Sequence, residues 1–259
     1  MKNKRLAALH NDNPFTFSLN VFYLPFLSVI VLGLIFYAEQ HYFGNLGHYG
    51  IYPREWFGLK GILFSPFLHS DYSHLFNNSM ALFVLLGFLQ YFYKNQTVIV
   101  IIAGIIFSGL GTWLMGRPSY HIGASGLVYV LVSFIFFKGI ITKYYRLMAL
   151  SFVVVLLYGG LLWYMFPGVG EERISWEGHL FGFITGLALA LLVRTPQFKK
   201  QPIYTWEFPD FDPQQDPFIK NFDDNGNFVP PPKPEEVIKH YFTTSIKVLY
   251  DFIESKTKS

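Results

Sequence analysis

The sequence predicts an all-α membrane protein with six transmembrane helices. Of its 259 residues, 52% are hydrophobic and only 14% are charged, against roughly 25% charged residues in ordinary soluble domains. None of its six apolar segments contains Asp, and we assign their few basic residues, Lys138 included, to span ends. Each approaches the ~20 residues that cross a hydrocarbon core. The segments cover residues 20–38, 74–93, 97–116, 124–141, 146–166 and 177–194.

The distribution of Lys and Arg predicts the orientation of these spans. An even number of spans puts both termini on one side of the membrane, and ten basic residues lie near the span ends on that side. Four lie on the other side, Arg54, Lys60, Arg117 and Arg173. Because cytoplasmic loops are enriched in Lys and Arg, both termini are expected in the cytoplasm. The ten are Lys2, Lys4, Arg5, Lys94, Lys138, Lys143, Arg146, Arg194, Lys199 and Lys200.

Three segments lie outside the spans. Residues 1–19 are expected to be a cytoplasmic N-terminal segment, and the aromatic, Gly-rich connection 39–73 is expected to lie in the membrane interface. Residues 196–259 form a Pro-rich, acidic tail that we also place in the cytoplasm. Apolar residues at helical spacing near its end predict one amphipathic helix. They are Ile238, Phe242, Ile246, Leu249 and Ile253.

Polar side chains in membrane spans are costly, which makes them candidates for function. His74 and Asn78 begin the second span, four residues apart and therefore on one helix face. Small residues surround Ser125 in the sequence Gly-Ala-Ser-Gly at the start of the fourth span. His179 starts the sixth span and precedes a stripe of small residues that favours close helix packing. The stripe consists of Gly182, Gly186 and Ala190.

Each of these features alone has an ordinary structural explanation. A Gly-x-Ser-Gly sequence can simply begin a helix, an interfacial His or Asn can cap one, and a small-residue stripe can serve only packing. Alternating span direction, however, brings all three groups to the same, extracytoplasmic end of spans two, four and six. A serine, a histidine that accepts its proton and side-chain donors for an oxyanion are together what acyl transfer requires.

The sequences HSDYSHLFNN, GASGLVYV and GHLFGFITG resemble the signature of rhomboid intramembrane serine proteases. The resemblance covers all six spans and implies that residues 20–195 form a six-helix protease domain. It implies a catalytic dyad of Ser125 and His179, with Gly123 and Gly126 as motif glycines. The arrangement of Trp56 beside Glu55 and Arg54 only loosely matches the Trp-Arg pair of the family's first loop.

The resemblance also implies roles for residues around the dyad. His74, Asn78 and the backbone N–H of Ser125 would form the oxyanion hole, and Tyr129 would stack on and orient the catalytic histidine. His69 matches a position that supports loop packing. Asn77 is an alternative to Asn78, which the family's four-residue spacing from His74 favours. His121 is interpreted as an exposed loop histidine without a special role.

The same reasoning limits cofactors and partners. The chain has no Cys and no His-Glu-x-x-His zinc motif, so no cofactor or metal is expected. A calcium loop beginning at Asn221 and Asp223 fails because Pro232 stands where its closing Glu belongs. The expected partners are single-span membrane substrates and the lipid bilayer, and no dense basic run indicates nucleic acid.

The predicted function is cleavage of transmembrane segments, with the active site opening to the extracytoplasmic side. Six spans without a seventh favour a bacterial inner membrane. One alternative is a rhomboid-like scaffold or chaperone that binds helices without cutting them, although such proteins have usually lost the serine or the histidine. A small transporter is a second alternative, but it would carry ionisable residues at mid-membrane.

Overall fold

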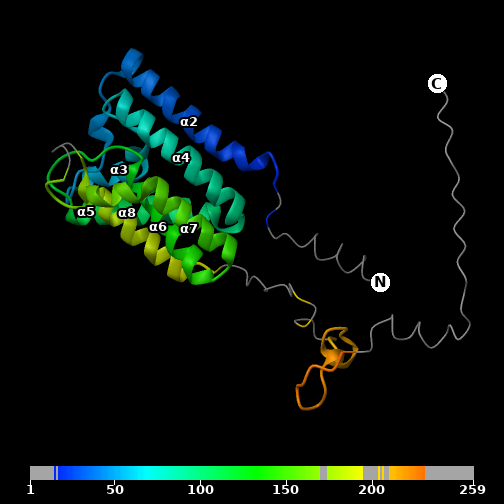
Figure 1. Cartoon of the computed structure of the whole chain (residues 1–259). Helices are drawn as coiled ribbons and strands as arrows, with labels where there is room; N and C mark the ends of the chain where they lie inside the picture. Colours follow the sequence, from blue (N-terminus) through cyan, green and yellow to red (C-terminus); the bar gives the residue numbers. More distant parts are fainter. Residues whose placement is uncertain are drawn as a thin grey trace, which may run out of the picture. The chain divides into compact units, whose positions relative to one another are not determined.

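The computed structural model describes residues 15, 17–169, 174–194, 204, 206 and 210–230. The chain forms two compact units, residues 1–200 and residues 201–259. The first unit is a helical bundle (Figure 1). The described residues contain no β-sheet, only the isolated bridges Ile51–His121 and Phe222–Phe228. The prediction of an all-helical fold is therefore confirmed for these residues.

Each predicted span corresponds to a helix of the bundle. The second half of the fifth span is a run of 3₁₀ turns, Gly159–Met165, rather than α-helix. Five of the helical segments are long and apolar enough to cross a membrane, whereas α8, with 17 residues, is shorter. The chain is thus an integral membrane protein with several apolar helices. The helices are α2 (Asn20–Ala38), α4 (Tyr72–Phe92), α5 (Thr97–Met115), α6 (Ser125–Thr142), α7 (Tyr145–Tyr158) and α8 (Trp176–Leu192).

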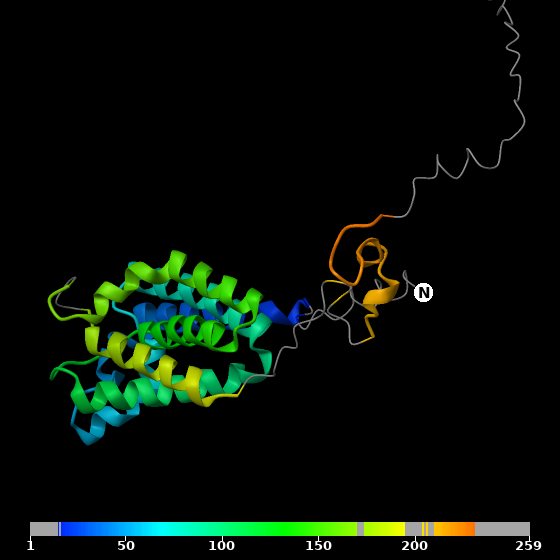
Figure 2. The ribbon, with the colours of Figure 1, turned by 60° about the horizontal axis from the view of Figure 1, so that its bottom comes forward.

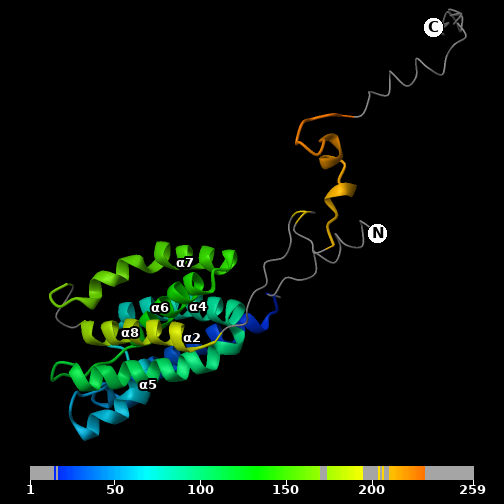
Figure 3. The same ribbon diagram turned by 90° about the horizontal axis from the view of Figure 1, so that it is seen from below.

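Helix α6 is the centre of the bundle, and most of its side chains are buried. It packs most extensively against α8, and also against α7, α5 and α4. Figures 2 and 3 show α7 and α5 on different sides of α6. Helix α2 packs along α4 at the edge of the bundle (Figure 1). A polar residue at the start of α6 is therefore surrounded by several other helices.

Two of the helices begin with side-chain caps. The Asp71 carboxylate accepts a hydrogen bond from the His74 N–H, which starts α4. The Ser175 hydroxyl accepts one from the Gly178 N–H, which starts α8. Such caps satisfy N–H groups that have no partner within the helix. They also fix the first turns that carry His74 and His179.

The first connection is a series of short helical turns that packs against the bundle. The short helix α3 (Gly61–Phe64) contacts α5. Backbone hydrogen bonds join Ile51 to His121, in the loop between α5 and α6, at 3.0 and 2.8 Å. The connection is therefore tied to the loop that leads to Ser125.

Lys138 lies about one turn before the end of α6, but it is not the exposed loop charge that charge counting implies. Its side chain is buried inside α6, and its ammonium donates hydrogen bonds to the carbonyl oxygens of Ala190, at 2.8 Å, and Val193. The last carbonyl oxygens of a helix receive no hydrogen bond from an N–H group of that helix. Lys138 therefore caps the C-terminal end of α8.

The second unit is described for residues 210–230, which form short 3₁₀ turns, Pro213–Gln215 and Ile219–Asn221, and a tight loop. In that loop the Asp223 carboxylate accepts hydrogen bonds from the backbone N–H groups of Asn225 and Asn227. The predicted C-terminal amphipathic helix lies outside the described residues.

Candidate active site

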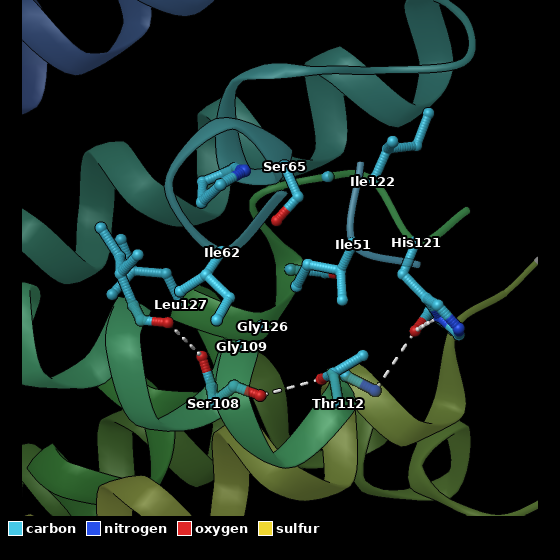
Figure 4. Close-up of a pocket in the computed structure, with 16 residues that line it drawn as sticks. Ile51, Ile62, Ser65, Ser108, Gly109, Thr112, His121, Ile122, Gly126 and Leu127 are labelled. Carbon is cyan, nitrogen blue, oxygen red and sulfur yellow. Dashed lines mark hydrogen bonds between the residues drawn. The ribbon is translucent and has the colours of Figure 1, made fainter. Parts of the chain in front are cut away.

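Ser125 is the first residue of α6 and follows a sharp turn. Gly123 in this turn has a φ of +111°, a conformation that favours glycine, and its N–H donates to the Ser65 carbonyl oxygen at 2.8 Å. Ser125 lines a small cavity of about 40 Å³, whose wall also includes Ser108 and His121 (Figure 4). A cavity of this volume, with hydroxyl and imidazole groups in part of its wall, has room for at least one water molecule.

His74 and Asn78 pack against this turn from α4. A Cβ at Gly123 would lie 2.6 Å from His74 Nε2 and 3.5 Å from Asn78 Nδ2. Asn78 Nδ2 is buried and has no hydrogen-bond partner among the described residues, while the neighbouring Asn77 is exposed. Buried polar groups are nearly always paired, and an exception calls for an explanation. Asn78, rather than Asn77, thus offers an unused donor beside the Ser125 turn.

The ring of His74 is held from the side away from Gly123. Ser70 Oγ donates to an Asp71 carboxylate oxygen at 2.7 Å and lies 3.2 Å from His74 Nδ1. Hydrogen bonds from the His74 backbone N–H and then from the Ser70 hydroxyl lower the pKa of Asp71. Asp71 therefore stays ionised near neutral pH and orients Ser70 and His74.

His179 lies in the first turn of α8 with a defined orientation. Its Nδ1 is 2.9 Å from the Tyr164 carbonyl oxygen, and because a carbonyl only accepts, Nδ1 must carry the proton. In the neutral ring this leaves the lone pair on Nε2. The ring stacks on Tyr129 of α6, with centroids 4.3 Å apart and planes 13° apart. Tyr129 is fixed in turn by its hydroxyl, which donates to the Leu161 carbonyl oxygen at 2.5 Å.

Glycines allow α6 and α8 to approach closely. A Cβ at Gly182 would collide with the Gly126 carbonyl oxygen and lie 2.9 Å from the Tyr129 Cβ. One at Gly186 would collide with the Val130 carbonyl oxygen. Even alanine at these positions would force the two helices apart. The glycines therefore bring the helix of His179 against the helix of Ser125.

One contact of a catalytic dyad, a hydrogen bond between the His179 ring and the Ser125 hydroxyl, is not formed among the described residues. His179 hydrogen-bonds through its N–H to the Ser175 carbonyl and through Nδ1 to the Tyr164 carbonyl. Catalytic hydrogen bonds are often long in the absence of substrate and shorten when it binds.

His121 is not the exposed loop histidine that the sequence indicated. Its side chain is 5% exposed, with Nδ1 2.6 Å from Ser175 Oγ and Nε2 3.0 Å from the Arg117 carbonyl oxygen. Burial lowers the pKa of His121. The interpretation failed because a loop position says nothing about whether another part of the chain covers it, and here the first connection and α8 do so.

His69 is also buried, and its ring lies against that of His74, with centroids 5.0 Å apart. Neither of its ring nitrogens has a hydrogen-bond partner among the described residues. Burial, followed by the charge of His74, lowers the pKa of His69 to about 4. His69 is therefore neutral at physiological pH and serves as an uncharged packing group behind His74.

Comparison with known proteins identifies the family. A family model for the rhomboid domain matches residues 53–196, more than half of the chain. The chain belongs to the rhomboid family. This family is one of intramembrane serine proteases, and the matched segment contains Ser125, His179 and the residues around them.

Similar proteins occur in mycobacteria and in a giant virus. An uncharacterized protein of Mycobacterium tuberculosis is 34% identical over 183 residues, which cover 68% of this rhomboid chain and 76% of the relative. One of Mycobacterium leprae is 33% identical over 189 residues, covering 70% and 73%. A protein of Acanthamoeba polyphaga mimivirus, 25% identical over 181 residues, carries the rhomboid name. The 181 aligned residues cover 68% of this chain and 93% of the viral protein.

Sequence reasoning missed one group of polar residues in this rhomboid domain. Glu177, two residues before His179, is 1% exposed and pairs with Arg117 at 2.7 Å. The sequence does contain a signal, because Glu177 is the only carboxylate in the six predicted spans. Charge counting alone treats Arg117 as a loop residue. No group of three residues that could hold a metal ion occurs among the described residues.

Proposed function

We propose that this rhomboid is an intramembrane serine endopeptidase that cleaves the transmembrane segments of single-span proteins. The observation that carries the proposal is the buried, unpaired amide of Asn78 beside the turn of Ser125. Leaving such a donor unpaired costs about 1–3 kcal/mol. In a helix-binding scaffold, the unpaired amide would only destabilise the fold. In an enzyme, the amide gains a hydrogen bond when an oxyanion forms.

In the first half of the reaction, Ser125 Oγ attacks the carbonyl carbon of the scissile peptide while His179 Nε2 takes the hydroxyl proton. The Tyr164 carbonyl supports this direction of transfer, because it fixes the proton of the neutral ring on Nδ1. The ring stack with Tyr129 holds the base in one plane. The carbonyl oxygen becomes an oxyanion that accepts hydrogen bonds from Asn78 Nδ2, from the Ser125 N–H and, when its Nε2 carries a proton, from His74.

Collapse of this intermediate breaks the C–N bond, and His179 gives its proton to the leaving amine. A water molecule then attacks the Ser125 ester, His179 takes a proton from that water, and the acid product leaves as the serine hydroxyl reforms. The cavity next to Ser125 supports this step because it has room for water and a few hydroxyl groups in a wall that is otherwise largely apolar. No cofactor is required.

The packing of α7 supports a lateral route for substrate. Helix α7 packs on α6 and on the 3₁₀ turns that follow it, but has little contact with α4. Its outer face is apolar, and Phe152 and Leu156 on that face are strongly exposed. A substrate helix in the membrane would reach Ser125 between α4 and α7. We retain the orientation inferred from charge, with both termini in the cytoplasm and the active site opening to the other side.

The test is cleavage of a model single-span substrate by the full chain in detergent and in liposomes. Ser125→Ala and His179→Ala should each abolish cleavage and labelling by a fluorophosphonate probe. Matched controls are Ser119→Ala and His48→Ala, which alter an exposed serine and an exposed histidine. Both controls should cleave like the wild type. A folded wild type that neither cleaves nor labels in either environment would overturn the proposal in favour of a helix-binding scaffold.

A further inference from the structure

The loop that leads to Ser125 is joined to the start of α8 by a group of polar contacts that the catalytic steps above do not use. This nucleophile loop, residues 116–124, carries Arg117 and His121, while Ser175 and Glu177 begin α8. The Glu177 carboxylate is buried almost completely, although the Arg117 side chain is 42% exposed. A buried carboxylate this close to a catalytic base requires a physical explanation.

The Arg117–Glu177 pair has a geometry that fixes two backbones rather than two side chains alone. Arg117 Nε lies 2.7 Å and Nη2 3.3 Å from the two carboxylate oxygens. The backbone N–H of Arg117 also donates to Glu177 Oε1, at 3.1 Å. In addition, Nη2 donates to the Ile174 carbonyl oxygen at 2.7 Å. Rotation of the loop away from α8 would therefore break four hydrogen bonds together.

His121 and Ser175 form a second link between the nucleophile loop and the start of α8. Ser175 Oγ accepts from the Gly178 N–H and lies 2.6 Å from His121 Nδ1, so it connects the α8 cap to the loop. His121 Nε2 contacts the Arg117 carbonyl oxygen, which joins the two links. Glu177, Gly178 and His179 follow one another in the first turn of α8. Any shift of this turn moves His179.

Stability alone does not account for these contacts. A buried ion pair contributes little net stability, because desolvation offsets the attraction between its charges, and apolar residues of similar volume often do as well. What the ion pair adds is a fixed distance between two elements. Errors of about 1 Å in the position of a catalytic group can lower a rate about 100-fold.

We propose that Glu177 is a positioning residue which, through Arg117 and with the His121–Ser175 contact, holds the nucleophile loop against α8 and so sets His179 relative to Ser125. The inference rests on the proposed protease function and identifies residues outside the dyad and the oxyanion hole. It predicts that the pair acts on the chemical steps and not on substrate binding.

Kinetic measurements on the full chain in liposomes test this prediction. Glu177→Gln keeps the size of the side chain and removes its charge, and should lower kcat about 10- to 100-fold with KM little changed. Glu177→Asp should recover part of that loss because it restores the charge. The control Glu55→Gln, at an exposed carboxylate in the first connection, should leave both constants unchanged.

A double-mutant cycle identifies the partner. Arg117→Gln should lower kcat like Glu177→Gln, and the double variant should be little worse than either, because both changes break one interaction. Arg117→Lys keeps the charge but not the forked geometry, and should fall between wild type and Arg117→Gln. If a folded Glu177→Gln protein keeps the wild-type kcat, or if only KM changes, the proposal is wrong.

A measurement that needs no activity separates this proposal from the proposed function. The chain has no cysteine, so Ser108→Cys introduces a single thiol at a buried wall of the cavity. Glu177→Gln should increase the maleimide labelling rate of this thiol, whereas Glu55→Gln should not. An inactive wild type whose labelling responds in this way would refute the protease and keep the positioning role. Equal labelling rates in folded proteins would refute the positioning role whether or not the protein cleaves.

Discussion

The two ends of the α6–α8 pair differ in how their polar groups are satisfied. At one end, Lys138 is buried with its ammonium bound to two carbonyl oxygens of α8, and Gln96 donates to the Arg194 carbonyl oxygen at 3.1 Å. At the other end, beside Ser125, the Asn78 amide is buried and unpaired within the described residues. The first end thus commits Lys138 and Gln96 to the last carbonyl oxygens of α8, although the buried Tyr93 hydroxyl there also lacks a partner among the described residues. The second end leaves an amide donor for a ligand.

The difference indicates which end of the helix pair contributes to stability and which end is available for reaction. Pairing every buried polar group stabilises a helix end but leaves no group to bind a transition state. Between the two ends, Gly182 and Gly186 hold the helices at a fixed close distance. Substitutions at the two ends should therefore act on different measurements, rate at one and stability at the other.

The largest effect is expected from Asn78→Ala. Loss of an oxyanion donor should lower kcat about 100- to 1,000-fold, while thermal stability stays unchanged or rises because an unpaired buried amide is removed. Asn77→Ala is the matched control, since Asn77 is exposed and next in sequence, and it should keep the wild-type rate. The measurements are substrate cleavage and thermal unfolding in one detergent. Equal rates for the two variants would contradict the oxyanion assignment.

Gly182→Ala should affect both ends, because it separates the helices. Overpacking typically costs about 1–3 kcal/mol, and the Tyr129 Cβ, 2.9 Å from the added methyl group, belongs to the residue that orients His179. Both the melting temperature and kcat should therefore fall. In Gly33→Ala, on α2, the methyl group meets nothing within 4 Å, and neither quantity should fall. A Gly182→Ala protein with wild-type properties would show that the close approach is unnecessary.

Lys138→Met should affect stability alone. It removes the donor that caps α8, at a cost of about 1–2 kcal/mol, and it lies at the end of α6 remote from Ser125. Unfolding in a denaturing detergent series measures the loss, and cleavage below the unfolding transition should match the wild type. The control, Lys94→Met, changes an exposed lysine. A drop in kcat without loss of stability would show that the two ends are not independent.

The smallest effect concerns pH. Burial lowers the pKa of His69 from about 6.5 to about 4 in the folded protein, so between these values the unfolded chain binds a proton that the folded chain does not. The free energy of unfolding should therefore fall as pH drops from about 6.5 to about 4. His69→Gln should make this dependence shallower, while His48→Gln, at an exposed histidine, should not. An unchanged slope in His69→Gln would contradict the shifted pKa.

Much of the site could be inferred from local sequence. The spacing of His74 and Asn78, the small residues around Ser125 and the stripe after His179 are patterns within single helices, and periodicity reports which residues share a face. The same logic could not recognise His121 as buried or connect Arg117 with Glu177. Those contacts join positions 54 and 60 residues apart, and no local pattern encodes them.

By itself, the sequence determined the helical segments, the family and the candidate site residues, because apolar length and side-chain chemistry are properties of the chain alone. Only the tertiary structure decided that Asn78 lacks a partner, that His179 carries its proton on Nδ1, and that Lys138 and Glu177 are buried. The reason is physical. Burial, tautomer and pairing depend on which groups of other helices come within hydrogen-bonding distance, and only packing sets those distances.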